Sequence, residues 1–297
     1  MAEQFNGRLA GAALFVAALL VAACTSGPES QEGKWAGRQV RVFAGSAIQP
    51  ALVEAAHLFQ EQTGAEVLLH FGGSGAMLSQ IALTGLGDIY LPGSSDFMVR
   101  AREQGTVEPD TEVRLAYLLP ALLVAKGNPK QVHGLADLAR PDVRVGLARP
   151  DTVCAGLYGV EALEGRGLGA AVRPRISGYA ESCAKTAQML ALGAVDAVLG
   201  WEVFTAWNPD AVERVPLAPG EIPRIGYIPA ARVTSSPDPE LAAAFLAFLE
   251  SPEAQAIYRS HGYLTSLAEA RRRAGADTPV GGTWELPPAW NPGAGFR

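Results

Sequence analysis

The chain has 297 residues, a net charge of −6 at pH 7 and 48% hydrophobic residues, so it can form one large domain or two smaller lobes with substantial cores. The acidic balance argues against nucleic-acid binding, because no basic surface can replace the counterions of a phosphate backbone. The four histidines show no zinc-ligand spacing, so we expect no structural zinc site.

The N-terminal segment has the pattern of an export signal. An apolar run from Leu9 to Ala23 follows one basic residue and ends at Cys24, after which a polar stretch begins. The run is too short for a membrane-spanning helix but suits a secretory signal. The pattern resembles the bacterial lipobox, in which the cysteine is acylated. We therefore expect a signal peptide over 1–23, lipidation of Cys24 and a tether over 24–38; the alternative is an ordinary signal peptide with an incidental cysteine.

Beyond the tether, short apolar runs alternate with amphipathic stretches, which predicts an α/β fold with parallel strands and crossover helices. We expect a first lobe over 39–118 and 226–275, a second lobe over 119–225 and a loosely ordered Pro/Gly-rich tail over 276–297. The expected strands are 40–44, 67–71, 88–91, 143–147, 175–177 and 196–200, and the runs 118–126 and 223–233 are expected to cross between the lobes. The expected helices are 50–62, 77–83, 239–250 and 252–261, with two more beginning near Ala155 and Cys183. Two adjacent crossings form a hinge, as in proteins whose clefts close on ligands.

Four loops that precede expected helices combine small residues with hydroxyl or polar groups, at 45–47, 72–75, 152–156 and 181–183. Glycine allows the backbone to approach a ligand, and the first N–H groups of a helix are unpaired, so such loops are natural anion sites. The alternative is that Ser46, Ser74 and Ser182 only cap their helices. None of the loops matches the phosphate-loop or dinucleotide-binding motif.

Several segments resemble the periplasmic molybdate-binding proteins of ABC importers. They are Val40-Arg-Val-Phe-Ala, His70-Phe-Gly-Gly-Ser-Gly-Ala-Met-Leu-Ser-Gln-Ile, Gly87-Asp-Ile-Tyr-Leu, Arg149-Pro-Asp-Thr-Val-Cys-Ala-Gly and Phe245-Leu-Ala-Phe-Leu-Glu-Ser-Pro-Glu-Ala-Gln. The last segment is shared by a wider set of solute-binding proteins and supports the fold more than the ligand. The resemblance implies the type II periplasmic binding fold, with two Rossmann-like lobes joined by a two-strand hinge.

The resemblance also implies a set of ligand contacts, namely Ser46, Ser74, Gly93, Ala155, Cys183 and Trp201. A molybdate or tungstate oxyanion would be held mainly through Ser46, Ser74, Ala155 and Cys183, although an alignment without gaps places Ala47 at the first position. Trp201 stands where the family usually has a tyrosine, and an indole offers only one N–H donor. Tyr227 is therefore a candidate hydroxyl donor, and Arg149 is a candidate nearby charge.

Cys154 and Cys183 depart from the family pattern, and their role is open. A disulfide would close a loop of about 29 residues and stabilise the chain by about 3 kcal/mol. Free thiols in the cleft would instead favour a softer ligand or a metalloid. The third alternative is that both are incidental buried residues.

The function implied by the resemblance is capture of a tetrahedral oxyanion by a monomeric solute-binding protein without enzymatic activity or cofactor. The protein would be extracytoplasmic, held at a bacterial membrane only by its lipid, and would deliver the anion to an ABC permease and its ATPase. A hydrolase with Ser74 or Cys154 as nucleophile lacks an identifiable base. A ligand sensor would keep the same cleft and is a further alternative.

Overall fold

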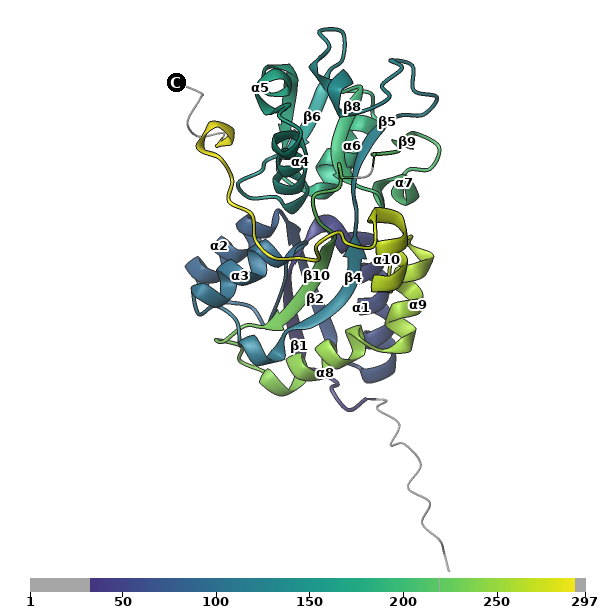
Figure 1. Cartoon of the computed structure of the whole chain (residues 1–297). Helices are drawn as coiled ribbons and strands as arrows, with labels where there is room; N and C mark the ends of the chain where they lie inside the picture. The colour runs from purple at the N-terminus through teal and green to yellow at the C-terminus, as the bar shows by residue number, and fades with distance from the viewer. Residues whose placement is uncertain (1–32, 219, 292–297) are drawn as a thin grey trace, which may run out of the picture. The chain divides into compact units, whose positions relative to one another are not determined.

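Two five-stranded mixed sheets, each flanked by helices, form two lobes in the computed structural model, which describes residues 33–218 and 220–291 (Figure 1). These residues belong to one compact unit. The expected α/β fold with two lobes is thereby confirmed. The expected signal peptide over 1–23 and Cys24 lie outside the described residues.

The first lobe contains a sheet with the strand order β2-β1-β3-β10-β4. Strand β1 is parallel to both of its neighbours, whereas β10 is antiparallel to both of its own. The strands are β1 (Gln39–Gly45), β2 (Glu66–Gly72), β3 (Ile89–Leu91), β4 (Val113–Leu118) and β10 (Gly226–Arg232). The helices are α1 (Gln49–Thr63), α2 (Ser74–Thr84), α3 (Ser95–Glu103), α8 (Pro239–Leu249), α9 (Pro252–Ser260) and α10 (Leu267–Ala274), and a short turn of helix, η1 (Ser46–Ile48), follows β1.

The second lobe contains a sheet with the order β7-β6-β8-β5-β9. Strand β6 is parallel to β7 and β8, and β5 is antiparallel to β8 and β9. The strands are β5 (Pro120–Ala125), β6 (Val145–Ala148), β7 (Ile176–Ala180), β8 (Ala197–Trp201) and β9 (Val212–Val215). The helices are α4 (Cys154–Gly165), α5 (Gly169–Val172), α6 (Cys183–Ala191) and α7 (Phe204–Trp207).

The apolar run expected over 118–126 is divided between the two sheets. Strand β4 ends at Leu118 in the first sheet, and β5 begins at Pro120 in the second. Proline has no N–H to donate to a strand ladder, so it is best placed at the start of a strand. The chain therefore changes lobe within one residue, and it returns through the connection that leads into β10.

The tether was expected to extend to residue 38, but residues 33–38 are part of the first lobe. Within residues 33–38, Trp35 is 2% exposed and its backbone N–H donates to the carbonyl of Thr63 at 3.0 Å. The side chain of Arg38 donates to the Asp238 carboxylate at 2.8 Å. Burial of the indole and this ion pair attach the segment to the first lobe.

The loose tail expected over 276–297 is also a wrong prediction for residues 276–291, which we call the C-terminal strap. The strap runs from α10 toward α4 and α5, in yellow in Figure 1. Val280 pairs with Ile225 in a β-bridge, and Trp290 is 2% exposed within the core of the second lobe. A Pro/Gly-rich sequence has little tendency to form regular structure by itself. These long-range contacts fix the strap in place.

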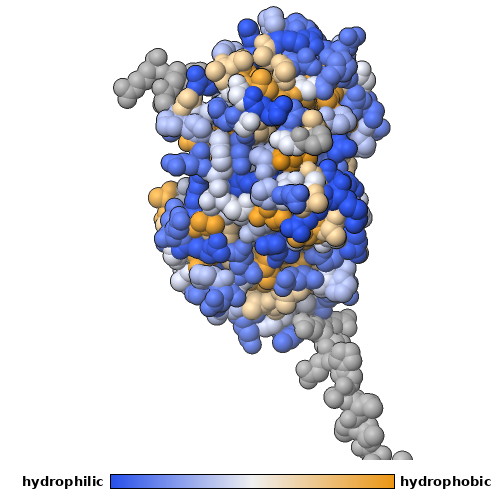
Figure 2. All heavy atoms as spheres, in the orientation of Figure 1, coloured by the Kyte–Doolittle hydropathy of each residue, from blue (hydrophilic) through white to orange (hydrophobic). Residues whose placement is uncertain are grey.

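The described residues include no helix that is long and apolar enough to span a membrane. Hydrophilic residues cover most of the face shown in Figure 2, with smaller apolar patches between them. Large apolar side chains are instead concentrated in the cores of the two lobes.

Candidate ligand-binding site

Loops from the carboxyl ends of strands in both lobes meet at one buried place, which we call the central cluster. Ser46 follows β1, Ser74 begins α2 after β2, and Gly93 follows β3. In the second lobe Cys154 and Cys183 begin α4 and α6, and Trp201 ends β8. The central cluster consists of Ser46, Ser74, Gly93, Cys154, Ala155, Cys183 and Trp201, and their side chains and backbone are buried.

The two lobes are in direct contact at this cluster. The Ser46 Oγ atom accepts a hydrogen bond from the Ala184 N–H of the second lobe at 3.1 Å. The Gly75 N–H donates to the Thr152 carbonyl at 2.8 Å. The first turns of α2 and α6 are thus each bonded to the opposite lobe. Both predicted serine loops therefore face the second lobe.

Gly93 brings its backbone close to Ser74 and to Cys154. Its N–H donates to the Ser74 Oγ atom at 3.0 Å. A Cβ atom at this position would lie 2.5 Å from the Cys154 sulfur and 2.9 Å from the Ala47 Cβ atom. Because every other residue type has that atom, only glycine allows this approach. The expected contact residue Gly93 is therefore part of the cluster, and Ala47 lies beside it.

The capping alternative applies to one of the three serines. The Ser182 hydroxyl oxygen accepts from the Lys185 N–H at 3.2 Å and caps α6. Neither Ser46 nor Ser74 accepts such a bond from its own helix. These two hydroxyls lie in the central cluster instead.

The two cysteines of the cluster are free thiols, and their sulfur atoms lie 3.6 Å apart. The structure therefore contains no disulfide between Cys154 and Cys183. Burial raises the pKa of the Cys154 thiol, but the nearby Cys183, Trp201 and Ser74 side chains and the Ala155 N–H outweigh it and leave that pKa below its ordinary value. Burial and the neighbouring Cys154 raise the pKa of Cys183. Cys154 is therefore the more acidic thiol of the pair.

Trp201 brings an unpartnered donor close to the cysteines. Its Nε1 atom is buried without a hydrogen bond, although the indole lies close enough to both sulfurs to lower their pKa values. Its ring packs edge-on against Tyr158, with ring centres 4.8 Å apart. The Trp201 indole N–H is therefore an available donor in the cluster.

Tyr227 does not belong to the cluster, so its prediction as a substitute hydroxyl donor is wrong. Its hydroxyl lies 3.5 Å from a carboxylate oxygen of Glu112, and the Arg114 guanidinium lies 4.0 Å from its ring centre. Tyr227 is in β10, where it pairs with β4 of the same lobe. Its contacts with Glu112 and Arg114 hold the Tyr227 side chain beside β4.

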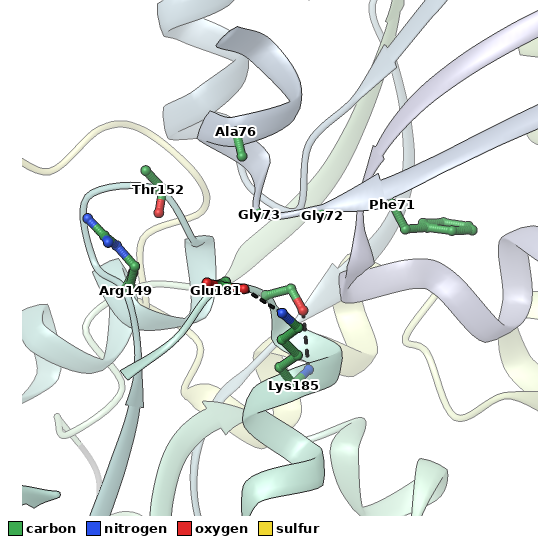
Figure 3. A pocket seen from close by; sticks show the side chains of 9 residues that line it. Phe71, Gly72, Gly73, Ala76, Arg149, Thr152, Glu181 and Lys185 are labelled. Atoms are coloured by element: carbon green, nitrogen blue, oxygen red, sulfur yellow. Dashed lines mark hydrogen bonds and ion pairs between the residues drawn. The ribbon is translucent and has the colours of Figure 1, made fainter. Parts of the chain in front are cut away.

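A pocket of about 430 Å³ adjoins the central cluster (Figure 3). It is lined by Phe71, Gly72, Gly73, Ala76, Arg149, Thr152, Glu181, Ser182 and Lys185. Gly73 and Ser182 directly precede two members of the cluster, Ser74 and Cys183. Arg149 lines this pocket rather than the cluster, and its guanidinium pairs with Asp151 at 2.9 Å. Lys185 pairs with Glu181, so both cations of the pocket are neutralised by carboxylates.

A buried ion-pair network between the lobes was not predicted from the sequence. The Arg224 guanidinium bonds to Asp96 of α3 at 2.8 Å and to Glu161 of α4 at 2.8 Å. It also lies 4.0 Å from the ring centre of Tyr158. Its partners are 128 and 63 positions away, and no local pattern marks such a pair.

No group of three or more His, Cys, Asp or Glu side chains in the described part of the chain is arranged to hold a metal ion. The donors of the central cluster are two hydroxyls, two thiols, an indole N–H and backbone N–H groups. Such neutral dipoles at helix N-termini suit a small anion or an uncharged polar ligand.

The family model described as bacterial extracellular solute-binding protein matches residues 40–264. A molybdate-binding protein of Rhodobacter capsulatus is 24% identical over 238 residues, which cover 77% of this chain and 89% of that protein. A Bacillus subtilis protein named as an ABC transporter substrate-binding lipoprotein is 24% identical, with coverage of 84% and 96%.

Solved structures share the fold. The periplasmic molybdate-binding protein of Azotobacter vinelandii superimposes with a TM-score of 0.65 at 22% identity, covering 76% of this chain and 99% of its own. The sulfate-binding protein of Mycobacterium tuberculosis reaches a TM-score of 0.68 at 17% identity, covering 82% and 93%. At these identities the likeness shows the two-lobed fold, and relatives of this fold carry different ligands.

Proposed function

Because this chain belongs to the bacterial extracellular solute-binding protein family, whose members bind substrates rather than transform them, we propose that it captures a tetrahedral oxyanion such as molybdate or tungstate. The observation that carries the proposal is the central cluster. It joins the Ser46 and Ser74 hydroxyls to the first residues of α4 and α6 from the opposite lobe. All of these donors are buried.

Capture depends on exchanging internal hydrogen bonds for bonds to the anion. The N–H groups of Gly93 and Ala184 now donate to serine oxygens, and the Ala155 N–H faces the sulfurs. Anion oxygens would accept from these N–H groups, and Ser46 and Ser74 would then turn to donate. Each lobe alone supplies only part of the donors, so the anion favours the closed arrangement.

Delivery of the anion follows from the family. We infer that the protein is extracytoplasmic and hands its ligand to an ABC permease that an ATPase drives. We further propose that the lipid on Cys24 anchors the chain to a bacterial membrane, in line with the relative named as a lipoprotein. Anchoring raises the effective concentration of the binding protein near its permease.

A ligand panel tests the proposal directly. The full-length protein is heated with molybdate, tungstate, sulfate or phosphate, and its melting temperature is followed. A ligand that binds only the native state stabilises it by RT ln(1 + L/Kd), where L is the free ligand concentration, and so raises that temperature. We expect molybdate or tungstate to give the largest rise. If none of the four anions stabilises the protein, the oxyanion assignment fails while the family assignment stands.

A further inference from the structure

We propose that Cys154 and Cys183 form a chelating dithiol site for the trivalent oxyacid of a metalloid, such as arsenious or antimonous acid. The inference rests on the proposed function in one respect, because it places this ligand in the same central cluster. It differs in its chemistry, since the ligand is held by covalent bonds to sulfur. The oxyanion is held by hydrogen bonds alone.

The distance between the two sulfurs suits a single atom that is bonded to both of them at a bent S–X–S angle. The two Sγ atoms are 3.6 Å apart. If each bond has about the 2.3 Å of a zinc–thiolate bond, the two bonds meet at roughly 100°. A linear two-coordinate metal would need sulfurs about 4.6 Å apart by the same bond length. The separation therefore favours a pyramidal or tetrahedral centre.

The surroundings of the sulfurs disfavour a divalent metal cation. Zinc sites in proteins have three or four protein ligands, commonly Cys, His or carboxylate. The described residues offer no third such side chain to these two thiols. The groups around the pair are neutral, namely the Ser74 hydroxyl, the Trp201 indole and the Ala155 N–H. An uncharged ligand is therefore buried here at lower cost than a cation.

The hydroxyl that a trivalent oxyacid retains would find a partner in the cluster. Trp201 Nε1 is fully buried, has no hydrogen-bond partner and lies beside both sulfurs. An N–H left unpaired in a buried site costs free energy until an acceptor arrives. The oxygen of the bound acid is such an acceptor.

The binding step balances without an oxidant or a reductant. Arsenious acid, As(OH)₃, and two thiols yield a dithioarsenite, (RS)₂AsOH, and two water molecules. Two As–O bonds and two S–H bonds break, two As–S bonds form, and each thiol proton leaves with a hydroxide. Arsenic stays trivalent, and hydrolysis reverses the step to release the acid.

The test uses reduced full-length protein titrated with arsenite, with bound arsenic and free thiols measured at each point. We expect one arsenic per chain, and loss of both cluster thiols as it binds. Cys154→Ser and Cys183→Ser should each weaken binding by about 100-fold, because the second bond is no longer intramolecular. The control is Cys24→Ser, which removes the third cysteine of the chain and should bind arsenite as the parent does.

The oxyanion panel separates this inference from the proposed function. A protein that binds molybdate or tungstate but keeps both cluster thiols titratable in excess arsenite overturns the metalloid site alone. The site is also overturned if the Cys154→Ser/Cys183→Ser double variant binds arsenic as tightly as the parent. Should a cysteine variant fold poorly, thiol loss and arsenic stoichiometry in the parent protein decide the matter.

Discussion

Arg224 and Asp96 form a two-point ion pair, at 2.8 and 3.1 Å, in which the side chains are only 5% and 2% exposed. The same guanidinium donates to Glu161 of the second lobe at 2.8 Å. It also donates to the carbonyls of Gly281 and Gly282 in the C-terminal strap, at 3.3 and 3.0 Å. One residue thus connects α3, α4 and the strap.

Replacement of the guanidinium should strongly destabilise the protein. Arg224→Met leaves the Asp96 carboxylate buried without its partner, which we expect to cost about 3–5 kcal/mol of unfolding free energy. Denaturant unfolding measures the loss. The control is Arg214→Met, whose exposed pair with Glu202 is worth about 1 kcal/mol or less. Equal losses in the two variants would contradict a stabilising role for the buried Arg224–Asp96 pair.

The strap should contribute to stability through Trp290. This side chain is 2% exposed, and its Nε1 atom donates to Glu164 at 2.5 Å. We expect Trp290→Ala to cost about 3–5 kcal/mol, as for other large aromatic deletions from cores. Trp290→Phe is the matched variant, since it keeps an aromatic ring in the core while losing the N–H and part of the indole, and it should cost less. Unfolding curves that coincide for Trp290→Ala and the parent would rule this role out.

Ser74 should be needed for oxyanion binding. Removing a hydroxyl that donates to a charged ligand costs about 1.5–3 kcal/mol, so Ser74→Ala should weaken binding by about 10- to 100-fold in calorimetry. Ser251→Ala is the control, because this serine caps α9 away from the cluster. It should lower the melting temperature without changing affinity. Unchanged affinity in Ser74→Ala would remove this residue from the site.

Cys154 should ionise before an ordinary cysteine. Although burial opposes its charge, the donors around it lower its pKa in the folded protein. Its contribution to stability is therefore full above the unfolded pKa of about 8.5 and is lost as the pH falls through the folded value. Thiolate absorbance should show one group titrating at lower pH than an ordinary cysteine, and Cys154→Ser should abolish it. Persistence of that titration in the variant would assign it to another thiol.

Cys24 should carry the membrane anchor. Cys24→Ala removes the sulfur that the lipid requires, so we expect the protein to leave the membrane fraction of the producing cells. Two-chain anchoring is what makes such attachment stable. Fractionation followed by mass measurement of the mature N-terminus checks both points. A membrane-bound Cys24→Ala protein would argue for another mode of attachment.

Local pattern was sufficient for most of the strands and for the loops that meet at the cluster. Ser46, Ser74, Gly93 and Ala155 could be proposed because each stands where a strand ends and a helix begins. The position of Tyr227 was mistaken because the side of a strand that a residue faces depends on pairing with β4. That pairing joins segments far apart in the sequence, so the residues next to Tyr227 do not predict it.

The sequence by itself determined the α/β class and the loops available for binding, because alternation of apolar runs and Gly/Ser turns is a property of neighbouring residues. Only the tertiary structure decided that Cys154 and Cys183 lie 3.6 Å apart as thiols, that Arg224 joins both lobes and that the strap packs. These contacts join residues distant in sequence, and their geometry depends on how the two sheets and their helices pack. Burial of Trp290 and of the Arg224 charge is therefore a result of packing, which composition does not reveal.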